Sequence, residues 1–312
     1  MKQRVRSLRT RIANGWIWLL FWNCAHAPWV VRLLEPHMTA IAWACSPYVR
    51  RVTRTNAKRL LGPSSSPQAR KELGRAVFGN CIDAVVEFGR NRNRTTEQIL
   101  SRLESVKGED EYSAARQQRR GAILVTAHLG AFETAMTMLA QREPKIHVVF
   151  RRDPSSIFER LRSEQHARLG ILDAPVDDGL SMWFGLRDAL RNDEVVLMQG
   201  DRVLPGQPGV AVPFLGGRMR VPTGPVTLAR ITGAPLIPTF AIQMKNGRVR
   251  IVIEKPIWMC DHPLGNGRTD TSIDPALLRL TSVIEQYVQS YPEQWLCLHL
   301  ACCDDAGPDF SR

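Results

Sequence analysis

Two patterns of apolar positions divide the chain into predicted strands and helices. Short apolar runs predict buried strands over 122–127, 145–150, 194–199, 210–214, 236–242, 248–254 and, at the edge, 295–300. Apolar residues at helical spacing, or helix-start signals, predict helices over 33–62, 68–90, 96–107, 226–231 and 275–290 and after Gly130 and Pro154. We therefore expect an α/β fold with a mixed, mostly parallel central sheet flanked by helices.

The first 62 residues differ in charge and in aromatic content from the rest. Residues 1–60 hold eleven Lys or Arg residues against Glu35 alone, which accounts for +10 of the formal net charge of +12. Five of the eight tryptophans lie in the same region. Basic residues and indole rings beside apolar runs are typical of a membrane interface, whereas nucleic-acid binders interleave basic and polar residues. An anionic membrane surface is the expected partner, and nucleic acid is not.

An apolar stretch from Gly15 to Val31 is just long enough to cross a membrane. It also imitates a signal peptide, with Ala25-His-Ala27 as the cleavage site, but Pro28 would follow the cut directly. We expect an uncleaved anchor that either spans the membrane or lies in its interface. Seven scattered cysteines, an odd number without a C-x-x-C pair, favour a reducing compartment, and no metal site is expected.

One stretch combines a predicted strand end with titratable side chains. The apolar run 122–127 leads directly into His128, and Glu133 follows five residues later in a predicted helix. An imidazole at the mouth of a sheet is a usable general base, and a carboxylate in the first helical turn is a candidate for its orienting partner. The alternative is a core or capping histidine beside an unrelated glutamate.

The H-x4-E spacing resembles the signature of the glycerolipid and lysophospholipid acyltransferase superfamily. The resemblance is greatest to the branch that contains the late lipid A acyltransferases and the phosphatidylinositol mannoside acyltransferases. It continues in the family's order through five further segments: Gln199–Arg202, Val212–Gly216, Pro222–Ala229, Thr232–Pro238 and Tyr291–His299. The chain departs from the family's pattern at His166, four residues before Gly170, where an arginine is usual, and at Cys297 and Leu300 near the terminal His299.

The resemblance implies transfer of an acyl group from an acyl-carrier-protein or coenzyme A thioester to a hydroxyl of a lipid A-type precursor or related glycolipid. It implies His128 as general base, with Glu133 fixing its tautomer, and amides around Leu129-Gly130 are candidate oxyanion donors. Candidate substrate-binding residues are Arg168 as first choice for anion binding, then Arg151, Arg152, Asp201, Arg202, Arg218 and Arg220. Asp201 and Arg202 follow a core strand, so they should face the same cleft as His128. No cofactor or metal is expected beyond the thioester co-substrate.

The expected organisation is a basic membrane-anchoring segment over 1–62, a catalytic domain over 63–303 and a frayed tail over 304–312. Thioester donors are cytosolic, so we expect the bacterial inner membrane, with the catalytic domain facing the cytoplasm. Three alternatives stay open: an acyltransferase acting on a lysophospholipid or aminolipid, a serine hydrolase, and a catalytically silent lipid-binding protein.

Overall fold

The computed structural model describes residues 15, 18–19, 21–24, 26–153, 155–203, 207–262 and 273–305. The helices are α2 Pro28–Cys45, α3 Pro47–Leu61, α4 Pro67–Asn91, α5 Thr96–Leu100, α6 Glu109–Gln117, α7 Phe132–Arg142, α8 Ser156–Arg168, α9 Leu180–Arg191, α10 Gly224–Thr232 and α11 Pro275–Ser290. The strands are β1 Leu103–Lys107, β2 Ala122–Thr126, β3 Ile146–Phe150, β4 Ile171–Pro175, β5 Val195–Gln199, β6 Gly209–Phe214, β7 Gly217–Pro222, β8 Leu236–Gln243 and β9 Val249–Ile253.

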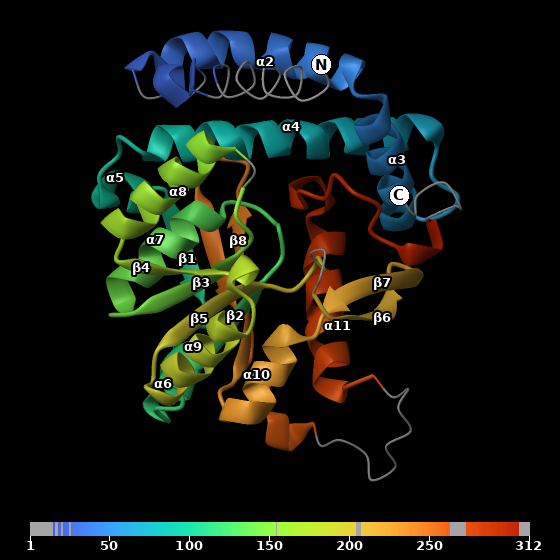
Figure 1. Cartoon of the computed structure of the whole chain (residues 1–312). Helices are drawn as coiled ribbons and strands as arrows, with labels where there is room; N and C mark the ends of the chain where they lie inside the picture. The colour runs from blue at the N-terminus through green and yellow to red at the C-terminus, as the bar shows by residue number, and fades with distance from the viewer. Residues whose placement is uncertain are drawn as a thin grey trace, which may run out of the picture.

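Seven strands form the main sheet in the order β1-β9-β8-β2-β5-β3-β4, and β6 and β7 form a separate hairpin. All neighbours in the main sheet pair in parallel except β8 and β9, which are the predicted antiparallel hairpin. The expected α/β fold with a mixed, mostly parallel sheet flanked by helices is therefore confirmed (Figure 1). Strand β2 lies at the centre, between β8 and β5.

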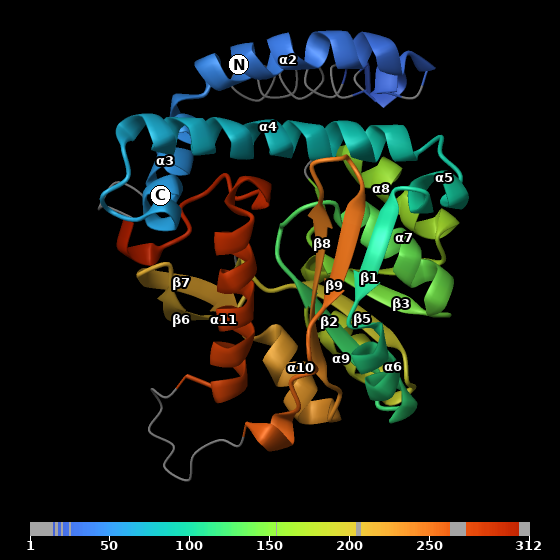
Figure 2. The same ribbon diagram turned by 180° about the vertical axis from the view of Figure 1, so that it is seen from behind.

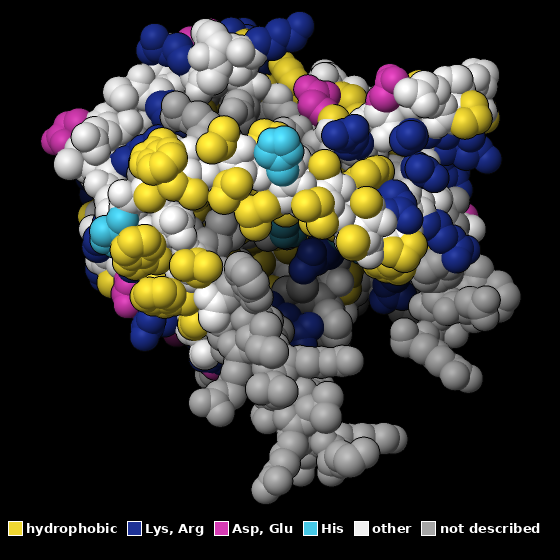
Figure 3. Space-filling view, turned by 90° about the horizontal axis from the view of Figure 1, so that it is seen from above, with side chains coloured by type: hydrophobic (Ala, Val, Ile, Leu, Met, Phe, Trp, Pro, Cys, Tyr) yellow, Lys and Arg dark blue, Asp and Glu magenta, His cyan; other side chains and the backbone are white. Residues whose placement is uncertain are grey.

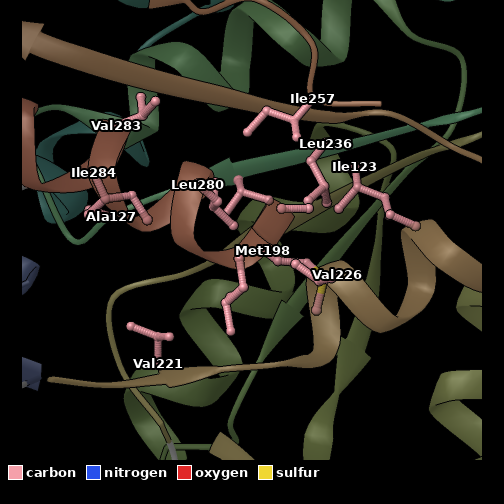
Figure 4. Packing of buried hydrophobic residues seen from close by; sticks show 14 of the residues in the cluster. Ile123, Ala127, Met198, Val221, Val226, Leu236, Ile257, Leu280, Val283 and Ile284 are labelled. Atoms are coloured by element: carbon pink, nitrogen blue, oxygen red, sulfur yellow. The ribbon is translucent and has the colours of Figure 1, made fainter. Parts of the chain in front are cut away.

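The apolar run of β2 is continuous because both faces of the sheet are covered. Ile123 and Val125 belong to a core that also includes residues of α9, α10 and α11, whereas Leu124 belongs to a second core with residues of α6 and α7. Figure 4 shows Ile123 and Leu236 of neighbouring strands near Leu280 of α11. This packing on two sides fixes the position of the β2 end, where His128 follows.

Helix α4 lies across one end of the sheet, and α2 lies along the side of α4 that faces away from the sheet (Figures 1 and 2). The single helix expected over 33–62 is instead two helices, because Pro47 follows Ser46 and starts α3. The proline at the first turn of α3 supplies no backbone N–H for the preceding helix to use. The chain turns at this break, so α3 points away from α2 and packs against α4.

The predicted N-terminal anchor lies partly outside the described residues, and its described part has two different sides. Phe21 and Cys24 are buried against α4, in contact with the side of the helix that carries Gly89. Trp18, Trp22 and Trp29 are instead exposed. None of the helices within the described ranges has the length and apolar character needed to cross a membrane.

Several predicted elements were wrong or missed. The helix expected over 96–107 is the short α5 followed by β1, and the edge strand expected over 295–300 makes only an isolated bridge from Trp295 to Leu129. In α4, Val85 is exposed although the predicted buried stripe included it. The buried side of the helix includes Val86 and Gly89 at this end instead.

Helices α6 and α9 and strands β4 and β7 were not predicted. In α6, β4 and β7 the apolar residues are few or interrupted by charges, so periodicity gave no signal. In α9, by contrast, the buried Met182, Leu186 and Leu190 lie at helical spacing, so the sequence carried a signal that was missed.

Candidate active site

The register of two neighbouring strands brings His128 and Asp201 together. Strands β2 and β5 are parallel, with Thr126 opposite Gln199 at their ends. His128 and Asp201 each lie two residues beyond that pair, at the same edge of the sheet. The carboxyl ends of parallel strands are the usual place for ligands in such folds. Asp201 is therefore in direct contact with His128, but its carboxylate is buried and does not itself face the pocket, which His128 and Arg202 line.

Asp201 accepts three hydrogen bonds through a carboxylate that is 2% exposed. Its Oδ1 lies 2.8 Å from Nδ1 of His128, and its Oδ2 accepts the His128 backbone N–H at 3.0 Å and the Trp295 indole Nε1–H at 2.9 Å. Burial by itself would raise the pKa of Asp201, but the charge of the His128 ring and these hydrogen bonds outweigh it and lower the pKa to about 2. Asp201 is therefore ionised at neutral pH, and its carboxylate pairs with the His128 ring.

This contact decides which ring nitrogen of His128 is free to take a proton. An ionised carboxylate only accepts hydrogen bonds, so Asp201 holds the proton of the neutral imidazole on Nδ1. Nε2 then carries the lone pair, and the side chain of His128 is 28% exposed and lines a pocket. The carboxylate beside Nδ1 would also stabilise the imidazolium that forms when Nε2 takes a proton.

Glu133 does not occupy the position expected for it beside Nδ1. It lies in the first turn of α7, as predicted, but its carboxyl group is buried and accepts a hydrogen bond from Nε2 of Gln165 in α8. Burial raises the pKa of Glu133 to about 8, and the Gln165 hydrogen bond opposes this rise only in part. The expectation that Glu133 fixes the His128 tautomer is thus corrected, because Asp201 already occupies Nδ1.

Hydrogen bonds to other parts of the chain hold the backbone that follows His128. Gly130 has a φ of +70°, and a Cβ atom there would lie 1.9 Å from the carbonyl oxygen of Ala241, so this position requires glycine. The N–H groups of Leu129, Gly130 and Ala131 donate to Ala127, Gln294 and Ala241 respectively. The expectation that amides around Leu129-Gly130 form an oxyanion site is therefore wrong, because these donors are already used.

A pocket of about 200 Å³ opens at His128. Arg202 and Arg151 line it together with Trp183 and residues 222, 224 and 225. Gly224 is needed here because a Cβ atom at this position would lie 2.4 Å from the Trp183 ring. Two of the predicted anion-binding arginines are thus in the same pocket as the candidate base.

The other predicted arginines lie elsewhere. Arg168 donates to the carbonyl groups of Arg92 and Asn91 at the end of α4, which ties α8 to α4 and removes it as first choice for anion binding. Arg152 pairs with Asp178 at 2.7 Å. Arg218 and Arg220 are exposed on β7 and do not line the His128 pocket.

A second, mostly apolar cavity of about 180 Å³ lies between the sheet and α7. Its lining includes Met136 and Leu139 of α7, Leu197 of β5 and Ile251 of β9. Four residues line both this cavity and the His128 pocket: Val149, Phe150, Met198 and Gln199. The candidate base therefore lies beside a space suited to a hydrocarbon chain.

Sequence reasoning did not identify Trp295 or Gln165 as parts of the site. Trp295 lies in the segment after α11, which also donates from Leu296 N–H to the His128 carbonyl at 2.7 Å. Trp295 lies in the segment Tyr291–His299 that resembles the family, but the resemblance did not indicate its contact with Asp201, which is 94 residues away in the chain. Among the described residues, no group of His, Cys, Asp and Glu side chains is arranged to hold a metal ion.

Comparison with known proteins shows which family the chain belongs to. Residues 1–301 match the family of bacterial lipid A biosynthesis acyltransferases. The phosphatidylinositol mannoside acyltransferase of Mycobacterium tuberculosis strain H37Rv is 29% identical over 238 residues, which cover 75% of this chain and 74% of the relative. The enzyme of that name from Mycolicibacterium smegmatis is 33% identical over 131 residues, 41% of this chain and 42% of the relative. The chain belongs to the bacterial lipid A biosynthesis acyltransferase family.

Proposed function

We propose that this protein moves a fatty acyl group from an acyl thioester to a hydroxyl group of a glycolipid at the bacterial inner membrane. The observation that carries the proposal is the pair of His128 and Asp201 at the junction of a polar pocket and an apolar cavity. The family and the names of the relatives support a glycolipid acceptor, either a lipid A-type precursor or a phosphatidylinositol mannoside.

In the proposed reaction, Nε2 of His128 takes the proton of the acceptor hydroxyl as its oxygen attacks the thioester carbonyl carbon. The tetrahedral intermediate then collapses, the C–S bond breaks and the thiolate leaves with the proton from the imidazolium. The acceptor gains an ester, and the carrier gains a thiol. Asp201 lowers the energy of the charged imidazolium throughout. This sequence needs no covalent acyl-enzyme and no metal or redox cofactor.

Charge on the carbonyl oxygen rises in the transition state and needs a donor. Since the amides of residues 129–131 are used elsewhere, we assign this role to a guanidinium group of the pocket, with Arg202 preferred because it directly follows Asp201. Burial lowers the pKa of His299 to about 4, and the positive charge of Arg202 adds to this shift, so the charge of Arg202 acts on this region.

The apolar cavity under α7 is the proposed site for the acyl chain. It adjoins the His128 pocket, so a thioester carbonyl in that pocket would direct its chain between α7 and the sheet. Burying each methylene contributes about 0.8 kcal/mol, which is enough to select a chain by the length the cavity holds.

The exposed side of α2 is the proposed membrane contact. Trp29, Leu33, Met38 and Ile41 are each more than half exposed, and hydrophobic side chains gather along this helix in Figure 3. Because Phe21 and Cys24 of the predicted anchor are buried against the protein while its Trp18, Trp22 and Trp29 are exposed, we favour a helix that lies in the interface over one that spans the bilayer.

The test is an acyl-transfer assay with purified protein in mixed micelles, with an acyl thioester and either a lipid A precursor or a phosphatidylinositol mannoside as acceptor. Mass spectrometry should find one added acyl chain on the glycolipid and an equal amount of released thiol. Release of free fatty acid with no acylated lipid, together with labelling by a serine-directed probe, would indicate a hydrolase. Transfer to a lysophospholipid or an aminolipid but not to either glycolipid would instead correct the acceptor class.

A further inference from the structure

One wall of the His128 pocket is an aromatic ring that has no part in the proposed proton transfer. Trp183 lies in the first turn of α9 and lines the pocket together with His128. Its side chain is partly exposed and packs against the main core. A tryptophan ring at the surface of a pocket offers a ligand a large apolar area, so Trp183 is a candidate contact for a substrate.

The backbone of α10 holds this ring in position. A Cβ atom on residue 224 would lie 2.4 Å from Cη2 and 3.1 Å from Cζ3 of Trp183, so the six-membered ring of the indole lies directly on Gly224. Helix α9 packs against α10, which begins at Gly224. A ring that is already fixed before a ligand arrives loses little conformational freedom on binding. Trp183 therefore forms a preorganised wall of the pocket.

Polar side chains line the same pocket. Arg151 and Arg202 are exposed, and Gln199 at the end of β5 is partly exposed. The guanidinium groups donate hydrogen bonds, and the amide of Gln199 can both donate and accept them. A flat apolar ring beside such groups matches a pyranose, which carries C–H groups on its faces and hydroxyl groups at its rim.

The other parts of the two reactants do not require this ring. A hydrocarbon chain fits the neighbouring cavity, whose lining is mostly apolar. In a coenzyme A thioester, the pantetheine arm separates the adenine ring from the reacting carbon, so the adenine lies far from Nε2 of His128. The acceptor is therefore the reactant whose ring lies beside the base.

We propose that Trp183 is the surface on which a sugar ring of the acceptor stacks, so that a hydroxyl group of the acceptor is held at Nε2 of His128. The inference rests on the proposed acyl transfer to a glycolipid. It makes Trp183 a binding residue that decides which acceptors are used, with no contact to the acyl donor.

The test compares Trp183→Leu with Trp183→Phe in the full chain. Leucine keeps an apolar side chain and a high helix propensity but has no flat face, whereas phenylalanine keeps the flat face. The acceptor is phosphatidylinositol mannoside, or a lipid A precursor where the wild type acylates that lipid. Relative to the wild type, KM for the acceptor should rise about tenfold in Trp183→Leu and by no more than about threefold in Trp183→Phe. KM for the acyl thioester should not change in either variant.

The matched control is Phe184→Leu, which replaces an aromatic residue by leucine at the next position of α9. Phe184 is 54% exposed and does not line the His128 pocket, so both KM values should equal those of the wild type. An unchanged acceptor KM in Trp183→Leu, or an equal rise in Trp183→Leu and Trp183→Phe, would overturn the proposal. A rise in KM for a coenzyme A thioester alone would also overturn it and would assign the ring to the donor.

A direct binding measurement separates this proposal from the proposed function. Calorimetry with phosphatidylinositol mannoside and with a lipid A precursor in micelles, without any thioester, needs no turnover. Trp183→Leu should bind the preferred glycolipid about tenfold more weakly than the wild type and Phe184→Leu do. Equal affinities would contradict stacking on Trp183 even if acyl transfer occurs. Absence of transfer by the wild type would refute the proposed reaction, and the affinities would still decide the role of the ring.

Discussion

At the scale of single residues, Asp201 has the position and charge that a histidine base requires. It holds the His128 ring through Nδ1, its own carboxylate is fixed by Trp295, and its lowered pKa keeps it ionised. Asn in its place keeps the size but presents an amide, which favours the opposite tautomer of the imidazole. The same geometry explains why Nε2 is the atom that faces the pocket.

We expect Asp201→Asn to lower kcat by a factor on the order of 10³ to 10⁴ with little change in the fold, because the imidazole loses both its orientation and its counter-charge. Steady-state kinetics with one thioester and one glycolipid acceptor measure this. Glu133→Gln is the matched comparison, since it makes the same chemical change at a carboxylate that does not contact Nδ1, and its kcat should fall far less. A larger loss in Glu133→Gln than in Asp201→Asn would restore Glu133 as the partner of the base.

Glu133 should instead affect stability in a way that depends on pH. Its folded-state pKa of about 8 lies above the unfolded value of about 4.3, so the unfolded chain releases this proton first as the pH rises. The contribution of this carboxyl group to stability is fully present below pH 4.3 and is lost as the pH rises to about 8.

Glutamine does not titrate, so Glu133→Gln should remove this decline, an effect on the order of a few kcal/mol between pH 5 and pH 8. Urea unfolding at several pH values measures it, with the exposed Glu111→Gln as control. Parallel stability curves for the wild type and Glu133→Gln over that range would contradict a buried neutral carboxyl group.

Some of the residues at the site were predicted from the sequence, and others were not. His128 was identified because it ends an apolar run, and Asp201 because it follows another core strand; parallel pairing then makes the two neighbours. The roles of Glu133 and Arg168 were misjudged because distance in the chain says little about which side chains share a polar contact. Gln165 and Trp295 come from α8 and the C-terminal segment, and only the packed fold brings them to the site.

At the scale of secondary structure elements, α7 connects the catalytic turn to the apolar cavity. The helix starts four residues after His128, and one side of it lines the cavity under the sheet. Strands β2 and β5 were predictable from nearly continuous apolar runs, whereas β4, which Asp173 interrupts, was not. The short α5 and the following β1 were not predicted either, because β1 has only two apolar residues, Leu103 and Val106, among polar and charged ones.

The cavity predicts a change in chain-length selection. Ala135 lines it, whereas Ala140 on the same helix does not. Ala135→Leu fills part of the space and should shift the preferred acyl chain to one that is shorter by a few methylenes, while Ala140→Leu leaves the preference as it is. Competition between thioesters of different length measures this, and an unchanged preference in Ala135→Leu would show that the acyl chain lies elsewhere.

At the scale of the whole molecule, the exposed apolar side of α2 is the proposed membrane contact, and the His128 pocket is the proposed site of acyl transfer. Helix α4 lies between α2 and the sheet end that carries His128 (Figure 1). This arrangement is consistent with an acceptor lipid that stays in the bilayer while its head group enters the site. The charge and tryptophan content of residues 1–62 predicted such a surface, but the separation of an apolar α2 from a basic α3 required the break at Pro47.

The membrane contact can be tested by charge on the apolar side of α2. Leu33→Asp/Ile41→Asp should weaken binding to vesicles, because both side chains are more than 60% exposed on this helix. Ile231→Asp, at an exposed apolar position of α10, is the control. Sedimentation with liposomes measures the bound fraction. Equal binding by all three proteins would exclude α2 as the contact.

If Nε2 of His128 takes the proton of the acceptor hydroxyl, as proposed, His128→Ala removes the base itself. Single-turnover transfer from an acyl thioester to the glycolipid should fall by at least about 10³-fold, while urea unfolding and vesicle binding remain close to those of the wild type. Acyl transfer by His128→Ala at a rate near that of the wild type would contradict the account.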